Sequence, residues 1–563
     1  MRLGLAAAAL ALALGGCVKP PAKVAAPPAP IELQILALND FHGNLEPPRS
    51  PIERVEANGT KRRELLGGAA YVAATLAQLR AGQSHSVTLA AGDMIGASPL
   101  TSAYFLDEPS IIAMNMMGLE YAAVGNHEFD KGSAELLRMQ NGGCAKFTSR
   151  TPCQVDRFGG ANFGFLAANV IRADGSTLFP ATAIKNLGPL QVGIIGMTLK
   201  GTGTLVTPSG VAGLRFTDEA ATANALIPQL KAAGADLIVL ALHQGGRSTG
   251  VYNVTGCPAL SGDILPILDA LDPGISVVVS GHTHEAYACE RPARDGSRRL
   301  LTSAGRYGYF VTDIRLSVDP GSGDLLGVRA SNVPVTSTVM LDSHVQALVD
   351  RYAKAAAPAA ARAIGRLAGP AMHSDFDDES AAANLVADAQ FAFSRDPARG
   401  GSQFALMNSS GVRTDLVPNA QGNVSYGQIF EMQPFGNGLV VMTLTGAQIG
   451  AVLEQQFQDD SYEAGARPEL LIPSDGLRFD YDLARPRGQR IVRITLQGHP
   501  LDPAANYRVT VNNFLASGGD GFSALTEGKD VVDAGPDLDA LEAWLKPGRA
   551  VPKLDRTRNV TAR

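Results

Sequence analysis

The stretch Ala122-Ala-Val-Gly-Asn126-His127-Glu-Phe-Asp130 is the most informative part of this chain, because an apolar run leads directly into an amide, an imidazole and carboxylates. Five further stretches in the first half open with a similar short run of apolar, β-branched residues. Such runs are typical of strands buried on both faces, and α/β proteins build sites at the carboxyl ends of these strands. The sequence therefore predicts an α/β fold with a functional site where the strand ends converge.

Four of these other runs also end in residues that bind metal ions. They end in Asp40-Phe-His42, Gly92-Asp93, His243 and Gly281-His282-Thr-His284, whereas the run at residues 192–197 has no ligand. Imidazoles, carboxylates and one amide oxygen, without a thiolate, suit borderline divalent ions such as Mn, Co or Zn. About seven donors exceed the needs of one tetrahedral ion but fit two ions that share a bridging carboxylate. We therefore expect two divalent metal ions.

Each motif by itself also has an ordinary interpretation. Gly92-Asp93 is a common turn dipeptide, and a single histidine after an apolar strand, such as His243, is more often a hydrogen-bonded core residue. The pair His282 and His284 is more specific, since two imidazoles at i and i+2 in a glycine-led turn have little packing purpose. The remaining four histidines are interpreted as surface or structural residues: His85, His344, His373 and His499.

The series of motifs resembles the calcineurin-like metallophosphoesterases. More closely, Leu38-Asn-Asp-Phe-His-Gly-Asn44 and Val124-Gly-Asn-His-Glu-Phe-Asp130 are similar to the 5'-nucleotidase and UDP-sugar hydrolase family. The resemblance implies a four-layer α/β/β/α catalytic sandwich and a C-terminal α+β substrate-binding domain joined by a helix. We expect the catalytic domain at residues 31–340, an Ala-rich helix broken by Pro358 at 341–367, the substrate-binding domain at 368–545 and a tail at 546–563.

The resemblance also implies a role for each residue of the site. Asp93 would bridge the two ions, and His284 stands where some nucleotidases of the family carry an amide. One ion would be held by Asp40, His42, Asp93 and His284, and the other by Asp93, Asn126, His243 and His282.

The imidazole of His127 would have a catalytic task. Oriented by Asp130, it would stabilise the phosphoryl transition state or protonate the leaving oxygen. The open alternative is that Asp130 caps a helix beginning near Lys131.

The implied reaction is release of phosphate from nucleoside 5'-monophosphates by attack of a metal-activated water on phosphorus. UDP-sugars and other nucleotide diphosphates are further candidate substrates. Two alternatives stay open. One is a related metallophosphoesterase acting on cyclic nucleotides, other phosphoesters or sulfur-bound substrates, and the other, from a different class, is a surface binding lipoprotein in which catalysis is secondary.

A second constellation in the C-terminal half matches the nucleotide-binding motifs of the family: Asn408, Arg413, Phe435, Phe514 and Asp520. The two aromatic rings would sandwich a base, the arginine would grip a phosphate or carboxylate, and the aspartate a ribose hydroxyl. The alternative is that both phenylalanines are core residues. One departure concerns residues 373–384, where three aspartates replace an expected arginine, so the substrate-binding domain is expected to hold its substrate with fewer cationic contacts or to prefer another ligand.

Composition and the N-terminus indicate an exported two-domain protein. The chain has 563 residues, 45% of them hydrophobic, and a formal net charge of −6, which argues against a polynucleotide as the main partner. Residues 1–17 resemble a lipoprotein signal ending at a lipid-modified Cys17, with residues 18–30 as a flexible tether; an ordinary signal peptide is the alternative. We expect attachment through this lipid alone to a bacterial membrane, with outer-membrane attachment facing the periplasm or the surface favoured by the resemblance. The oligomeric state stays open.

The other four cysteines fit an oxidising compartment, because they form an even set. Three pairings are possible, and proximity in the sequence favours Cys144 with Cys153 and Cys257 with Cys289. The second bridge would fasten the loop after His243 to the region just after His284. Zinc binding by these cysteines is the alternative, although no Cys-x-x-Cys spacing supports it.

Overall fold

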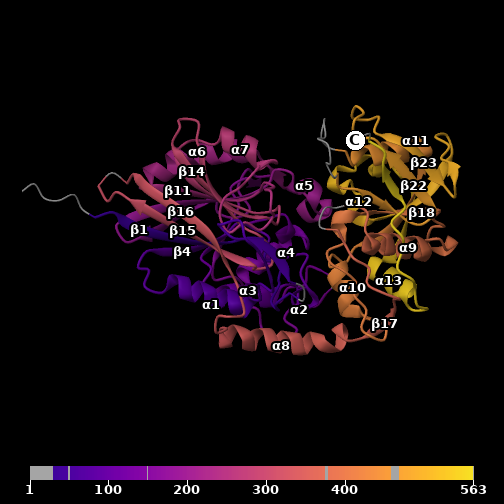
Figure 1. The fold of residues 1–563 in the computed structure, drawn as a ribbon, viewed down its shortest axis with the longest axis horizontal. Coiled ribbons are helices and arrows are strands. Elements are labelled where there is room, and N and C mark those ends of the chain that lie inside the picture. Colours follow the sequence, from indigo (N-terminus) through magenta and orange to yellow (C-terminus); the bar gives the residue numbers. More distant parts are fainter. Residues whose placement is uncertain are drawn as a thin grey trace, which may run out of the picture.

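The computed structural model describes residues 29–48, 51–148, 150–321, 323–374, 378–457 and 468–561. The predicted lipidation site Cys17 and nearly all of the predicted tether lie outside the described residues. Figure 1 shows two lobes, with helix α8 (Ser343–Ala360) running along their lower edge from the first lobe to the second. Within the described residues, no helix is both long and apolar enough to cross a bilayer.

Two six-stranded sheets form the first lobe, and their central strands are parallel. The order of the first sheet is β16 (Leu325–Pro334), β15 (Phe310–Val318), β1 (Ile31–Leu38), β4 (Ser86–Ala90), β5 (Tyr121–Ala123) and β6 (Gly164–Leu166). The order of the second sheet is β13 (Ala286–Pro292), β14 (Arg298–Ala304), β12 (Ile275–Ser280), β11 (Leu237–His243), β9 (Leu190–Thr198) and β8 (Thr182–Leu187).

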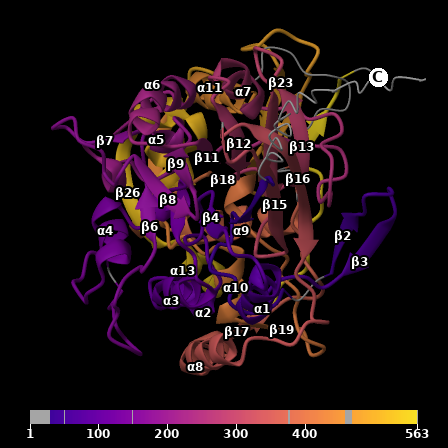
Figure 2. The same ribbon diagram turned by 90° about the vertical axis from the view of Figure 1, so that its left-hand side faces the viewer.

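The two sheets face each other across an apolar core, and helices cover their outer faces. Successive side chains of strand β1 point to opposite faces of its sheet. Ile35 packs between the two sheets, whereas Leu36 packs against the helices. Figure 2 shows α6 (Glu219–Ala232) and α7 (Ile264–Ala270) on one side of the paired sheets and α1 (Ala69–Arg80) and α3 (Glu108–Met117) on the other. The predicted four-layer sandwich is confirmed.

The second lobe is a smaller α+β unit with two larger sheets and the two-stranded pair β17–β19. Its five-stranded sheet runs β21 (Leu471–Pro473), β18 (Phe404–Asn408), β25 (Asn506–Asn512), β20 (Gly438–Thr445) and β26 (Lys529–Pro536), and its four-stranded sheet runs β24 (His499–Pro500), β23 (Ile491–Leu496), β22 (Leu477–Tyr481) and β27 (Thr557–Asn559). The helices are α9 (Ala381–Ser394), α10 (Tyr426–Met432), α11 (Gly446–Gln455), α12 (Asn513–Ala516) and α13 (Asp537–Leu545). Strand β27 pairs with β22, so Thr557–Asn559, which fall within the predicted tail, belong to the four-stranded sheet.

Shorter elements complete the described chain. They are β2 (Ile52–Val55), β3 (Lys61–Glu64), α2 (Leu100–Ala103), α4 (Ser133–Asn141), β7 (Val170–Ile171), α5 (Thr202–Leu205), β10 (Arg215–Phe216), β17 (Ala363–Arg366) and β19 (Asn423–Ser425), together with six short 3₁₀ turns.

Helix α8 differs in length from the predicted helix at 341–367. It begins after Asp342, whose carboxylate accepts the backbone N–H of His344 at 2.9 Å, and it continues through Pro358 to Ala360. It stops there because the next residues form β17, which pairs with β19. Strand β17 also packs closely against Leu545, since a Cβ at Gly365 would lie 2.3 Å from the backbone of Leu545.

The two lobes share a packed interface. Leu100 and Ala103 of α2, in the first lobe, are buried within the apolar core of the second lobe together with Phe430 of α10. The Arg150 guanidinium lies over the rings of both Tyr104 and Phe430, at 5.3 and 5.4 Å. These contacts bring the loops that follow the first lobe's strands against the second lobe.

Both predicted disulfide bonds are present. Cys144 is joined to Cys153 in the loop after α4, and Cys257 is joined to Cys289 of β13. The second bridge ties the loop after β11 to the strand that follows His284, as the sequence predicts.

Candidate functional site

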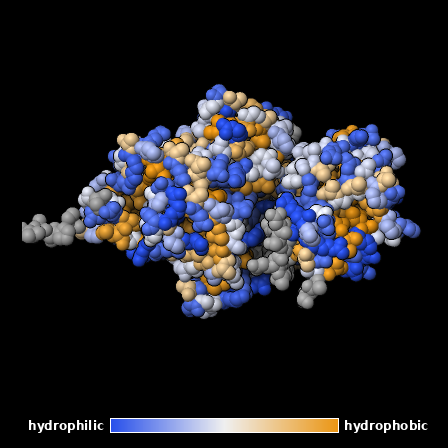
Figure 3. Space-filling view, turned by 90° about the horizontal axis from the view of Figure 1, so that it is seen from above, coloured by the Kyte–Doolittle hydropathy of each residue, from blue (hydrophilic) through white to orange (hydrophobic). Residues whose placement is uncertain are grey.

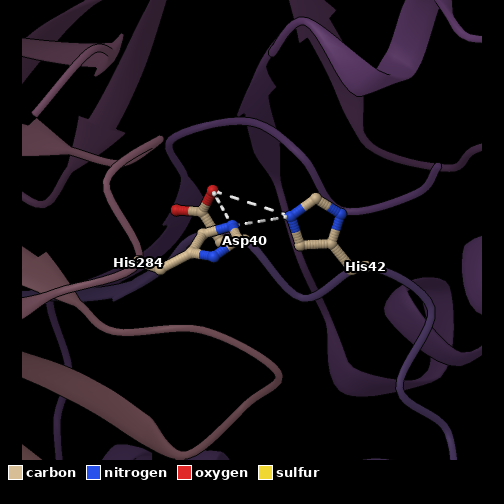
Figure 4. A group of neighbouring side chains, drawn as sticks. All are labelled: Asp40, His42 and His284. Atoms are coloured by element: carbon tan, nitrogen blue, oxygen red, sulfur yellow. Dashed lines mark hydrogen bonds and ion pairs between the residues drawn. The ribbon is translucent and has the colours of Figure 1, made fainter. Parts of the chain in front are cut away.

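Three side chains from two strand ends converge on one point, and Asp40 and His42 among them are fully buried. Asp40 and His42 follow β1, and His284 follows β12 (Figure 4). The Nε2 atoms of the two histidines are 3.1 Å apart, and the Nε2 atom of His284 is 3.6 Å from Oδ1 of Asp40. The Nδ1–H of His42 donates to the Gly96 carbonyl at 2.9 Å, so its Nε2 atom carries the free lone pair.

A second triad lies beside the first and consists of Asp93, His243 and His282. The Nε2 atom of His243 is 3.0 Å from Oδ2 of Asp93 and 3.1 Å from Oδ1 of Asn126. Its Nδ1–H donates to the Ala91 carbonyl at 2.7 Å, which again leaves the Nε2 atom to bind a metal ion. Asp93 Oδ2 also lies 3.8 Å from Nε2 of His42, so this carboxylate stands between the two triads.

The backbone around the triads is held in unusual conformations. Five of the seven predicted ligands have a positive φ between 46° and 72°: Asp40, His42, Asp93, His282 and His284. Non-glycine residues rarely adopt this region, and such residues cluster at functional sites. Gly125 allows the loops to approach, since a Cβ there would lie 2.2 Å from Oδ1 of Asp93.

Buried polar side chains hold these loops in place. The Glu128 carboxylate accepts the N–H groups of Asp93 at 2.8 Å, Met94 at 2.7 Å and Gly125 at 2.6 Å, which joins the loops after β4 and β5. Asn39 donates to Oδ2 of Asp40 at 2.7 Å and to the Gly305 carbonyl at 2.7 Å. The positions of the triads therefore follow from the strand ends and their own hydrogen bonds.

The residues present fit two divalent cations. In each triad the potential ligand atoms lie within 4.8 Å of one another. Burial lowers the pKa of His282 to about 3 and holds the pKa of His42 and His284 well below the usual value, so these imidazoles are in the neutral, ligating form. Burial raises the pKa of Asp40 to about 7, with Asp93 adding to it, and cations between the two carboxylates would relieve this buried negative charge.

His127 stands at the edge of the second triad and is paired with Asp130. Its Nδ1 atom is 2.9 Å from Oδ2 of Asp130, and its backbone N–H donates to Oδ1 of Asp93 at 2.8 Å. Although burial disfavours the charged ring, Asp130 raises the pKa of His127. Helix α4 begins at Ser133 with no capping side chain, so the alternative that Asp130 caps this helix is wrong.

One cavity of about 310 Å³ joins this centre to the second lobe. Asp93, Asn126, His127 and the two histidines after β12 line one wall. All five predicted substrate-binding residues line the opposite wall: Asn408, Arg413, Phe435, Phe514 and Asp520. Hydrophilic side chains gather where the lobes meet, as seen in Figure 3.

Comparisons with known proteins agree with this architecture. Residues 33–286 match the calcineurin-like phosphoesterase family, and residues 358–527 match the 5'-nucleotidase C-terminal domain. A 5'-nucleotidase precursor from Thermus thermophilus superposes with a TM-score of 0.76 at 27% identity, covering 95% of this chain and all of that chain. The chain belongs to the 5'-nucleotidase family.

Two curated relatives match most of the length of this chain. Endonuclease YhcR of Bacillus subtilis (strain 168) is 29% identical over 92% of the chain, and the chain spans only 40% of that relative's length. A probable 5'-nucleotidase of Treponema pallidum (strain Nichols) is 25% identical over 92% of the chain and 91% of its own length.

The second wall of the cavity of this 5'-nucleotidase family member is arranged around Asp520. Its Oδ2 atom accepts from Nδ2 of Asn408 at 2.9 Å, and Asn512 holds Asn408 in turn at 3.0 Å. Phe435 lies against His127, with ring centroids 5.8 Å apart and nearly parallel planes. Phe514 rests on Gly519, where a Cβ would come within 2.5 Å of its ring.

Glu379, which closes the acidic part of the segment at residues 373–384, serves the fold of the second lobe. The Glu379 carboxylate accepts three backbone N–H groups just before and within β27, including Thr557 at 2.9 Å, so it holds the C-terminal strand. Asp375 and Asp377 lie outside the described residues. His373, interpreted from the sequence as surface or structural, instead lines the cavity, with Nδ1 2.8 Å from Asp415.

Sequence reasoning missed several further cavity residues, four of them with charged or aromatic side chains. Arg247, Arg306 and Tyr307 line the cavity from the first lobe, and Glu469 lines it from the second. Single arginines in loops have no distinctive spacing, and the only available signal was the position of Gly305-Arg306-Tyr307 directly after a strand.

Proposed function

We propose that the protein is a metal-dependent phosphohydrolase that releases phosphate from nucleoside 5'-monophosphates. The observation that carries this proposal is the joining of two features by one cavity. The paired Asp/His triads open into the same space as the phenylalanine rings and the Asp520 carboxylate of the second lobe. A phosphate held at the first wall would therefore leave its nucleoside within reach of the second.

The ligand assignment follows the two triads. We propose that Asp40, His42 and His284 hold one ion, that His243, His282 and Asn126 hold the other, and that Asp93 is shared. When bound, two divalent ions, with Mn, Zn or Co as the candidates, would lower the pKa of the attacking water and neutralise charge on the phosphoryl oxygens.

His127 is proposed to act on the phosphoryl group itself. The Nδ1–H of His127 donates a hydrogen bond to Asp130, so Nε2 faces the cavity. The Asp130 carboxylate also raises the pKa of the ring, which favours its protonated form. A protonated Nε2 can donate to a phosphoryl oxygen as charge develops there, or give its proton to the leaving oxygen. Its ring is also covered by Phe435, which limits the access of water to this face.

The second lobe is proposed to recognise the nucleoside. Phe435 and Phe514 offer aromatic faces to a base, and Asp520 offers a carboxylate oxygen to ribose hydroxyl groups. Arg413 supplies positive charge close to the first triad, where it lowers the pKa of His284 together with burial and His42. Asn408 orients Asp520 through their hydrogen bond.

We also propose that the protein is exported and held at a membrane by a lipid on Cys17. Two disulfide bonds support an oxidising compartment, since such bonds are rare in the cytosol. Incorporation of radiolabelled palmitate in wild type and in Cys17→Ala tests the anchor. Equal labelling of both would contradict it.

Phosphate release tests the activity. The purified protein is incubated with AMP, UDP-glucose, cyclic AMP, a small aryl phosphate and DNA, in the presence of Mn, Co, Zn or EDTA. We expect metal-dependent turnover that is fastest with AMP. Turnover of the aryl phosphate alone would remove the nucleotide assignment, and cleavage of DNA alone would favour the activity in the name of the Bacillus subtilis relative. A metal-loaded protein inert on every substrate would favour a binding lipoprotein.

A further inference from the structure

Lys131 directly follows Asp130 and forms an ion pair with Asp107, in the turn between α2 and α3. Its Nζ atom is 2.6 Å from Oδ2 of Asp107, whose side chain is fully buried, whereas the lysine side chain is 25% exposed. The Ser102 hydroxyl donates to the other carboxylate oxygen, Oδ1, at 2.7 Å. A buried carboxylate is costly unless it is paired and hydrogen-bonded, so this contact gives Lys131 a fixed partner.

The carboxylate of Asp107 does not serve the helix that follows it. Asp107 stands at the residue before α3, where an aspartate commonly caps a helix, but its side chain accepts no N–H group of that helix. The backbone there is left-handed, with φ of 59° at Leu106 and 64° at Asp107. Non-glycine residues adopt this conformation rarely. The ordinary reason for an aspartate at this position is therefore absent, and its partner is Lys131.

The two charges of the pair stabilise each other. Although burial disfavours the charged form of both groups, Asp107 raises the pKa of Lys131 and Lys131 lowers the pKa of Asp107. The Asp130 carboxylate adds to the shift at Lys131, so the ammonium group lies within electrostatic reach of Asp130. The ion pair is thus formed at neutral pH beside the carboxylate that orients His127.

The segment of residues 97–107 is bonded at both ends to the same two residues. At its start, the Ala97 N–H donates to Oδ2 of Asp130 at 3.1 Å. At its end, Asp107 holds the ammonium group of Lys131. Asp130 and Lys131 are consecutive, so one segment grips this turn at two points, which limits the movement of the Asp130 carboxylate.

Two further contacts hold this segment in place. Gly96 precedes it and packs against the turn of His127, since a Cβ there would lie 2.3 Å from the His127 carbonyl oxygen. Within the segment, Leu100 and Ala103 of α2 are buried in the apolar core of the second lobe. The segment is therefore fixed to both lobes and provides a rigid support for the turn that it grips.

We propose that Lys131 and Asp107 are positioning residues, which hold the Asp130 carboxylate against Nδ1 of His127 and so keep Nε2 directed into the cavity. Neither residue lines the cavity, so they act only through Asp130. Without the ion pair, the turn would keep the bond from Ala97 but lose its second attachment. Small errors in the placement of a catalytic group lower the rate of the chemical step. This inference rests on the proposed function and adds two residues to it.

Steady-state phosphate release tests the positioning role. It would be measured with AMP and with a small aryl phosphate, in the presence of Mn, and metal content and melting temperature are recorded for each protein. The control is Lys185→Met, which removes a lysine of similar exposure that pairs with Glu120 in the same lobe. The variants are Lys131→Met, Lys131→Arg, Asp130→Asn and the doubles Lys131→Met/Asp107→Asn and Asp130→Asn/Lys131→Met.

We expect Lys131→Met to lower kcat by about three- to tenfold on both substrates and to change KM by no more than about twofold, because Nε2 of His127 acts in the chemical step. Lys131→Arg should restore kcat to within about twofold of wild type, since an arginine can also pair with Asp107. Both ions should stay bound in every variant, and Lys185→Met should match wild type.

The doubles separate positioning from general stability. In the Asp130→Asn background, Lys131→Met should lower kcat by no more than about a further twofold, because a residue that acts through Asp130 cannot add its full effect once Asp130 is altered. Lys131→Met alone leaves a buried carboxylate unpaired and may not fold. Lys131→Met/Asp107→Asn removes both charges, and we expect it to fold and to show the same fall in kcat.

Four results would overturn the positioning role. They are unchanged kcat in a folded variant without the ion pair, a loss that multiplies fully with that of Asp130→Asn, a change confined to KM, and loss of a metal ion. Failure of the proposed function looks different. Wild type would then release no phosphate from AMP, or Asp130→Asn would turn over normally and remove the role of Asp130 itself.

Discussion

In the first lobe the candidate ligands stand at the ends of five buried strands, whereas in the second lobe the cavity-lining residues lie in short elements such as α12 and on the loops between them. The first wall is fixed by buried hydrogen bonds such as those of Glu128, and the second is fixed by ring packing and by the Asn408–Asp520 contact. This difference indicates a division of tasks. The first wall should determine turnover of every substrate, and the second should determine which substrates bind.

The change with the largest expected effect is Asp93→Ala, because this carboxylate faces both triads. We expect loss of metal from both positions and a fall in kcat of roughly a thousandfold or more for all phosphate esters, since metal charge supplies several kcal/mol at about 1.4 kcal/mol per factor of ten. Metal analysis and phosphate release measure both effects. The exposed Asp174→Ala is the control. Retention of two ions would contradict the bridging position.

His127→Ala should separate chemistry from metal binding within the first wall. We expect both ions to remain and kcat to fall by about a hundredfold to ten-thousandfold on AMP and on a small aryl phosphate alike, as for loss of a general acid or base. Asp130→Asn should give a smaller fall, because the ring stays but loses its anionic partner. Normal turnover by metal-loaded His127→Ala would contradict the proposed role of His127 in the chemical step.

Phe514→Ala should affect only the second wall. Loss of a stacking surface worth about 1–3 kcal/mol should raise the KM for AMP by roughly five- to a hundredfold and leave the KM for a small aryl phosphate unchanged. Gly519→Ala should act in the same direction, because its Cβ would displace the Phe514 ring. Gly450→Ala, whose Cβ meets nothing closer than 4.0 Å, is the matched control. Equal effects on both substrates would argue against base stacking.

The smallest effect on activity is expected at Asp537, which is buried at the start of α13 in the second lobe. Burial raises the pKa of its carboxyl from 3.8 to about 7, so the folded protein holds this proton more tightly than the unfolded chain does. Wild type should therefore lose stability as pH rises from about 4 to about 7, by on the order of 1–4 kcal/mol.

Asp537→Asn should be free of this loss. Urea midpoints at pH 5 and pH 8 would measure it, and the exposed neighbour Asp539→Asn is the control. A wild-type midpoint that does not fall relative to Asp537→Asn between these pH values would contradict the assignment. The KM for AMP should be the same in both proteins, which keeps this effect apart from that of Phe514.

The first wall was predictable because strand periodicity and strand ends are visible in the sequence. An apolar run that stops at His243 or Asp93 predicts both a buried strand and the position of the polar side chain at the end of that strand. The left-handed backbone of these residues was not predictable, since no glycine or asparagine marks it. Loop residues such as Arg306 were missed because their position depends on bonds between distant segments, as in the contact of Tyr307 with Asp40.

The second wall was predicted less completely for a related reason. Phe435 and Phe514 were recognisable from family motifs, but their neighbours Gly519 and Glu469 depend on how loops fold over one another. The length of α8 was overestimated because an Ala-rich pattern does not show where β17 finds its partner β19. Local pattern predicts the elements here, and contacts between segments that are distant in the sequence decide where they end.

The left-handed backbone at five of the proposed ligand residues has a consequence for metal supply. Ordering a residue costs about 1–2 kcal/mol of chain entropy, and here folding meets that cost before any ion is captured. Little of the free energy of metal binding is therefore needed to order the loops, which favours high affinity and slow exchange of the ions. The proposed ions would then be retained when free metal is scarce, and brief treatment with a chelator should strip them incompletely.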